Sequence, residues 1–161
     1  DVTMPSRVSV GGTTLKLNGM GLREATVFNI DVYVAGLYLQ SPSRSAKKIL
    51  STDQKRRMVL HFVRDVDADD IKEAFRKGFR GTPEALRAKV RKLEGWTKAM
   101  KEGQEAVFTY VPGEGLTVQI AGRTYGKIEG ADFAKVFFGI WLGSDPPNAG
   151  LKRGLLGGSC D

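Results

Sequence analysis

Two side chains in the first quarter of the chain have the chemistry to bind an anion. Arg23 carries a permanent positive charge, and its planar guanidinium can make two parallel hydrogen bonds to a carboxylate. Tyr33, ten positions later, adds a hydroxyl donor. Both stand in the mostly apolar stretch LNGMGLREATVFNIDVYVAGLYL, residues 17–39. An unpaired charge in apolar surroundings costs at least several kcal/mol, so Arg23 needs either an internal partner or an external anion.

The sequence leaves both kinds of partner open. Glu24, Asp31 and Asp65 are candidates for an internal ion pair, in which case Arg23 would only hold the sheet together. Tyr33 has a similar alternative, as an ordinary strand tyrosine whose hydroxyl is bonded to the backbone.

Arg23 and Tyr33 can act together only if the chain doubles back between them. Ten residues of straight strand span about 33 Å. The stretch from 23 to 39 is also long for one strand. We therefore predict a bend or hairpin between Glu24 and Asn29.

The other reactive side chains give little support to catalysis or metal binding. His61 is the only histidine, and Cys160 is the only cysteine and lies in a glycine-rich tail. A Cys/His zinc site and an internal disulfide are therefore not expected. The acids between Asp65 and Glu73 lack the glycine and the terminal glutamate of a calcium loop, and they fit a helix N-terminus better. No phosphate-binding or dinucleotide motif is present, so we expect no metal and no cofactor.

Length and composition indicate one domain, spanning residues 1–161, with ordinary globular content. No run of 18 apolar residues is present, so no transmembrane helix is predicted. The net charge is +7, but the basic residues are dispersed in two loose groups, residues 44–57 and 87–101. We interpret these groups as solvated helix faces and expect no nucleic-acid binding. Contact with an anionic membrane or another polyanion is the alternative.

Patterns along the chain predict the elements that must position these side chains. Strands are expected within residues 7–19, 23–39, 56–66, 105–113, 115–122 and 123–130. Helices are expected within residues 41–52, 67–79, 82–100, 131–143 and 145–158. Asp67 and Thr82 are the predicted N-caps of the second and third helices, with Pro83 in the first helical position. Short connections between successive strands favour an α+β fold, with one curved antiparallel sheet and helices on one face.

Two separated motifs resemble those of a known family. LNGMGLRE and VYVAGLYL resemble the N-terminal signature of the chalcone isomerase fold family. FFGIWLGSDPPNAGLKRGLLG resembles the C-terminal signature of its bacterial chalcone isomerase-like branch, and RRMVLHFVRDVDADDIKEAFRKGF fits between them. The resemblance covers residues 8–158. It implies an open-faced β-sandwich, found in plant isomerases that close a flavanone ring and in relatives that hold a fatty acid in the same cleft.

The resemblance also assigns roles to individual positions. Arg23 matches the arginine that stabilises an oxyanion in the isomerases and meets the carboxylate in the fatty-acid binders. Tyr33 stands where the isomerases have a catalytic threonine, and the fatty-acid binders likewise pair the arginine with a tyrosine. The isomerases' catalytic tyrosine and asparagine correspond to Ile71 and Gly78, and their late hydroxyl-bearing residue corresponds to Ile140. Of the isomerase constellation only the arginine clearly remains.

The resulting prediction is a non-catalytic protein that binds a fatty acid or similar amphipathic carboxylate in an apolar cleft. The predicted ligand-binding residues are Arg23, Tyr33, Ile71, Phe75, Gly78, Ile140 and Trp141. One alternative is an intramolecular lyase of the chalcone isomerase type acting on a phenolic ligand, with Arg23 as its catalytic residue. Another is a structural or partner-binding module. The missing initiator Met and the usual exported character of the bacterial branch predict a periplasmic or exported protein, and a cytoplasmic location stays open.

Overall fold

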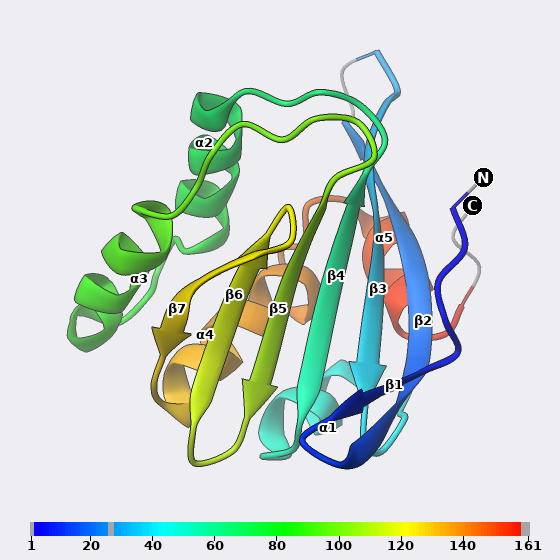
Figure 1. Ribbon diagram of the computed structural model, residues 1–161, viewed down its shortest axis with the longest axis vertical. Coiled ribbons are helices and arrows are strands. Elements are labelled where there is room, and N and C mark those ends of the chain that lie inside the picture. Colours follow the sequence, from blue (N-terminus) through cyan, green and yellow to red (C-terminus); the bar gives the residue numbers. More distant parts are fainter. Residues whose placement is uncertain (1, 26–27, 159–161) are drawn as a thin grey trace.

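The computed structural model describes residues 2–25 and 28–158. They contain one seven-stranded antiparallel sheet (Figure 1). Its strands are β1 (Arg7–Val10), β2 (Thr13–Ala25), β3 (Ile30–Leu39), β4 (Arg56–Phe62), β5 (Glu105–Val111), β6 (Gly115–Ile120) and β7 (Arg123–Ile128). They lie side by side in sequence order. This meander is the arrangement that short connections predict, so the antiparallel sheet is confirmed.

The β2–β3 hairpin brings the two candidate anion-binding residues together. Its turn includes Phe28 and Asn29, both with positive φ, 72° and 48°. The register then places Arg23 directly opposite Tyr33, and a bulge follows between Arg23 and Glu24. Side chains of directly opposed residues lie on one face of a sheet, so both project to the same side. The predicted hairpin is confirmed, except that Thr26 and Val27 lie outside the described residues.

The helices cover one face of the sheet, as predicted. They are α1 (Ala46–Ser51), α2 (Ala68–Gly78), α3 (Arg87–Glu94), α4 (Ala131–Leu142) and α5 (Ala149–Leu155), with a short 3₁₀ helix at Glu84–Leu86. In Figure 1 α1, α4 and α5 lie behind the sheet. The apolar α4 supplies Phe133, Phe137 and Phe138, all fully buried, and the Phe137 ring lies 4.7 Å from that of Phe108 on β5. None of the described helices is long and apolar enough to cross a bilayer.

The opposite face of the sheet carries a much smaller apolar cluster. Val10, Leu15, Tyr38 and Val59 are buried there. The Tyr38 hydroxyl donates to the Pro5 carbonyl at 2.7 Å, which ties the N-terminal segment over this cluster. Most of the core therefore lies between the sheet and the helices, and the architecture is the predicted open-faced one.

The predicted helix over residues 82–100 is wrong in both its bounds and its cap. Its α-helical part is α3 alone, preceded by the 3₁₀ turn. Thr82 is not an N-cap, because its hydroxyl donates to the Phe79 carbonyl at 2.6 Å. Pro83 is the residue before the 3₁₀ turn rather than the first helical residue. Asp67 does hold the N-cap position of α2, but its side chain makes no capping hydrogen bond.

Tertiary contacts explain why the third helix stops at Glu94. The Trp96 ring lies against Gly126 of β7, where an added Cβ would come within 2.6 Å of the indole. Further on, Met100 pairs with Val66 through two backbone hydrogen bonds of 2.8 and 2.9 Å. The chain therefore leaves the helix through a turn at residues 95–96, although the apolar spacing up to Met100 continues the helical pattern.

Candidate functional site

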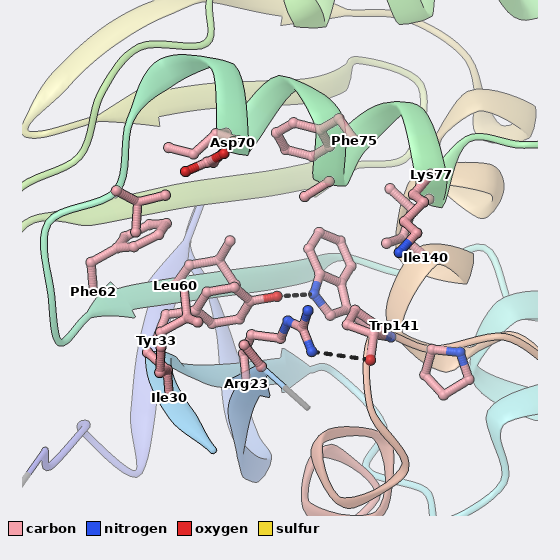
Figure 2. Close-up of a pocket in the computed structure, with 18 of the residues that line it drawn as sticks. Arg23, Ile30, Tyr33, Leu60, Phe62, Asp70, Phe75, Lys77, Ile140 and Trp141 are labelled. Carbon is pink, nitrogen blue, oxygen red and sulfur yellow. Dashed lines mark hydrogen bonds between the residues drawn. The ribbon is translucent and has the colours of Figure 1, made fainter. Parts of the chain in front are cut away.

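A cavity of about 680 Å³ lies between α2, the ends of β2, β3 and β4 nearest the β2–β3 turn, and the segment that joins α4 to α5. All seven predicted site residues line it: Arg23, Tyr33, Ile71, Phe75, Gly78, Ile140 and Trp141. Figure 2 shows five of them converging from the strands, from α2 and from α4, namely Arg23, Tyr33, Phe75, Ile140 and Trp141. The structure thus brings the whole predicted set together, and a role of each residue in ligand binding stays a prediction.

Arg23 is half-buried at one end of this cavity and is held by neutral oxygen atoms. Its Nη1 donates to the carbonyls of Glu24 at 2.9 Å and Pro147 at 3.1 Å, and to Oδ1 of Asn148 at 3.3 Å. These three bonds fix the orientation of the guanidinium but bring no negative charge to it.

The internal ion pair that the sequence left open as an alternative for Arg23 is absent from the described part of the chain. Within residues 2–25 and 28–158, no ion pair joins Arg23 to Glu24, Asp31 or Asp65. Its Nε and Nη2 atoms make no hydrogen bond to any described residue. This is the guanidinium edge that makes two parallel hydrogen bonds to a carboxylate.

Asn148 fastens the loop before α5 onto β2 and so fixes the anchor of Arg23. Its Oδ1 accepts from the Glu24 backbone N–H at 3.2 Å, and its Nδ2 donates to the Leu22 carbonyl at 3.0 Å. Gly19 and Gly21 of β2 allow α5 to approach the strand closely. A Cβ on Gly21 would lie 2.4 Å from the Leu151 carbonyl oxygen of α5, so a larger residue does not fit there.

Tyr33 presents a neutral hydroxyl beside the arginine. The buried Trp141 donates its Nε1–H to the Tyr33 hydroxyl oxygen at 2.9 Å (Figure 2). Burial raises the Tyr33 pKa to about 12, although the Trp141 hydrogen bond and the Arg23 charge both act to lower it. The hydroxyl proton has no acceptor among the described residues, so it is available to a ligand.

The remaining walls of the cavity are mainly apolar. Ile71 and Phe75 come from α2, Leu60 and Phe62 from β4, and Ile140 from α4. At Gly78 the two helices touch, because an added Cβ would lie 2.8 Å from Cγ2 of Ile140. The predicted importance of Gly78 therefore has a physical basis in helix packing.

Comparison with known protein families gives a match over nearly the whole chain. The family described as chalcone isomerase-like matches residues 1–157. The chain belongs to the chalcone isomerase-like family. Among solved structures, a fatty-acid binding protein of Arabidopsis thaliana superposes with a TM-score of 0.73. It is 18% identical in sequence, and the match covers 95% of this chain and 90% of that chain. No curated protein matches.

The two comparisons confirm the family resemblance and the fold class drawn from the sequence. For this chalcone isomerase-like chain, sequence reasoning found the cavity walls but missed three features of its charged end. Asn148 and Pro147 anchor Arg23 from a loop more than 120 positions away. Lys77, one position before Gly78, also lines the cavity. Asn148 stands just before α5, and its side chain can both donate and accept hydrogen bonds. Nothing in the sequence indicates that its partners lie on β2.

The structure also bears on the expected absence of a metal site. In the described ranges, no three His, Cys, Asp or Glu side chains are grouped to hold a metal ion. His61 is bonded instead to Glu105, its cross-strand neighbour, with Nδ1 and Oε2 2.9 Å apart. Cys160 lies outside the described residues.

Proposed function

We propose that this chalcone isomerase-like protein binds a fatty acid or a similar single-chain carboxylate, with the head group on Arg23 and the tail in the cavity. One observation carries the proposal. The Nε–Nη2 edge of Arg23 faces an apolar cavity and has no carboxylate partner among the described residues. The structural relative from Arabidopsis thaliana, titled a fatty-acid binding protein, supports the same function.

The energetics of such a complex divide into head and tail. At the head, hydrogen bonds that involve a charged group contribute about 1.5–3 kcal/mol each, and Tyr33 can donate one more. Along the tail, each buried methylene contributes roughly 0.8 kcal/mol before the ordering of the chain is subtracted. The head group thus sets the orientation and the tail supplies most of the gross affinity.

Calorimetric titration of dodecanoate into delipidated protein tests the proposal. We expect saturable one-site binding to the wild type and at least about 30-fold weaker binding to Arg23→Gln. Arg91→Gln is the matched control, because Arg91 is exposed on α3 and does not line the cavity. Absence of binding to wild type, or equal affinity of the Arg23→Gln variant, would overturn the proposal.

Chalcone isomerase-type chemistry is the second candidate. A guanidinium and a neutral phenol donor aimed at one space are the groups that stabilise a developing oxyanion. On the other hand, Ile71, Gly78 and Ile140 offer no functional group at the positions that the family resemblance assigns to isomerase side chains. Decay of chalcone absorbance in the wild type and in Arg23→Gln decides between the two, because equal rates would remove this candidate.

An exported or periplasmic location also remains a proposal, which rests on the sequence resemblance. Fractionation of the native host, followed by immunodetection of the protein, tests it. Recovery in the cytoplasmic fraction would overturn it.

A further inference from the structure

Lys77 brings a second positive charge to the cavity end where Arg23 lies. It stands on the last turn of α2 and lines the same cavity. In Figure 2 its side chain descends from the helix toward Ile140, and Arg23 points up from below, with Trp141 between the two in this view. Its ammonium group makes no hydrogen bond or ion pair with any described residue.

The helix dipole alone does not account for this orientation. A cation in the last turn of a helix is favourable wherever it points. Arg76, in the same turn, is two-thirds exposed and lies 3.9 Å from Glu73 and 3.7 Å from Glu94, away from the cavity. Lys77 is also exposed, but it has no carboxylate partner in the described part of the chain and it lines the cavity.

The lining is unevenly charged along α2. Arg80 follows Lys77 at the C-terminal end, where the acidic lining residue is the exposed Asp145. The other lining acids, including Asp67, gather at the N-terminal end of the helix. Asp70, the lining acid on α2 nearest to Lys77 in sequence, stands seven positions before it, about 10 Å along the helix. The C-terminal end of α2 thus adds Lys77 and Arg80 to the lining, whereas the fourth basic lining residue, Arg64, adjoins the acids of the N-terminal end in sequence.

From this geometry we infer that the head site accepts a head group with two negative charges, and that the ligand class includes single-chain phosphomonoesters. The donors that line this cavity without an acceptor among the described residues are the Nε–Nη2 edge of Arg23, the Tyr33 hydroxyl and the Lys77 ammonium. A carboxylate offers two oxygens and one charge. A phosphomonoester offers three acceptor oxygens and a charge of about −1.5 to −2 at neutral pH. The inference rests on the proposed function, because it uses the same cavity for the tail.

Decyl phosphate and decyl sulfate separate charge from shape, since they share the chain and the three terminal oxygens but differ in charge. We expect wild type to bind the phosphate about tenfold more tightly at pH 7.5, in titrations below the critical micelle concentrations. Lys77→Gln should bring the ratio close to one, and Lys77→Arg should retain it. Lys72→Gln is the control on the same helix, because Lys72 does not line the cavity. Thermal unfolding of each variant checks that it is folded.

Equal affinity of wild type for the two compounds would overturn the inference, as would an unchanged ratio in Lys77→Gln. Titration with decanoate keeps the two proposals distinguishable. If decanoate binds and the phosphate shows no preference that depends on Lys77, the inference fails and the carboxylate proposal stands. If decyl phosphate binds with that preference and decanoate does not bind, the carboxylate proposal fails and the inference stands.

Discussion

Two arginines that pair with opposite ends of β3, Arg56 on β4 and Arg23 on β2, have opposite surroundings. Arg56, the first residue of β4, is 1% exposed, and its guanidinium carbon lies 5.0 Å from the ring centre of Tyr110 and 5.1 Å from that of Phe138. Burial lowers the pKa of Arg56 from its ordinary value, and its Nη1 has no hydrogen-bond partner among the described residues. Our interpretation of the basic group 44–57 as solvated is therefore wrong for Arg56. Arg23, by contrast, opens onto a cavity.

The tyrosines beside the two arginines sharpen the contrast. The Tyr110 hydroxyl donates to Oδ1 of Asp53 at 2.6 Å, and its pKa is raised to about 12 by burial and by that carboxylate. The Tyr33 hydroxyl accepts from Trp141 and keeps its own proton. The cluster of Arg56 and Tyr110 thus includes a bonded carboxylate, whereas Arg23 and Tyr33 bond to no carboxylate among the described residues. An enclosed charge therefore marks a ligand site only where space adjoins it and its donors lack an acceptor.

The largest expected effect is on stability, at Arg56. Arg56→Ala should lower the free energy of unfolding by about 3 kcal/mol, because it leaves a void between two aromatic rings. Arg56→Met, which fills the space without a buried charge, should be within about 1 kcal/mol of wild type or more stable. Urea denaturation measures both. Equal losses in the two variants would show that the buried charge itself stabilises the fold.

The next largest effect is expected on ligand binding, when Arg23 loses its guanidinium group but keeps a positive charge. Arg23→Lys should weaken dodecanoate binding about tenfold, because an ammonium replaces two parallel hydrogen bonds and no longer reaches all three anchoring oxygens. Its free energy of unfolding should change by no more than about 1 kcal/mol. A Lys variant that binds like wild type in calorimetry would reduce the role of Arg23 to charge alone.

The contact between α2 and α4 gives an effect of similar or smaller size. Gly78→Ala should destabilise the protein by about 1–2 kcal/mol, because its Cβ meets Cγ2 of Ile140. Ile140→Ala in the same chain should recover part of that loss. A double-mutant cycle from denaturation curves measures the coupling, and additive effects would show that the two side chains do not compete for space.

A smaller effect is expected from the Tyr33 hydroxyl. Tyr33→Phe should weaken dodecanoate binding about fivefold, the value of one neutral donor. It should also cost about 1 kcal/mol of stability, since Nε1 of the buried Trp141 loses its acceptor. Unchanged affinity in Tyr33→Phe would mean that the head group does not reach the hydroxyl.

The last effect is absent at neutral pH and appears only in alkaline solution. The Tyr33 pKa rises from 10.0 to about 12 in the folded protein, so the folded state holds the proton more tightly than the unfolded state. Stability from this group is therefore complete below pH 10 and falls as the pH rises from about 10 to 12. Denaturation at stepped pH should show a shallower decline in Tyr33→Phe than in wild type. Identical slopes would contradict the raised pKa.

Much of the site was predictable because its elements are local in sequence. The stretch from 23 to 39 is too long for one strand, which predicted a bend or hairpin between Glu24 and Asn29, and the hairpin sets Arg23 opposite Tyr33. The apolar α4 was equally clear from its composition. Asn148 and Pro147 were not predictable as anchors, because their contacts depend on how α5 settles against the glycines of β2. Lys77 was missed for a similar reason, since either side of α2 satisfies the helix dipole.

The most direct test of the central claim follows the head group itself. Dodecanoate labelled with ¹³C at its carboxyl carbon, bound to the wild-type protein, can be titrated by NMR. A carboxylate paired with a guanidinium is favoured in its ionised form, so the account predicts that the bound acid titrates with a lower pKa than the same acid in water. A bound acid that titrates at or above its value in water would place the head group away from Arg23 and contradict the account.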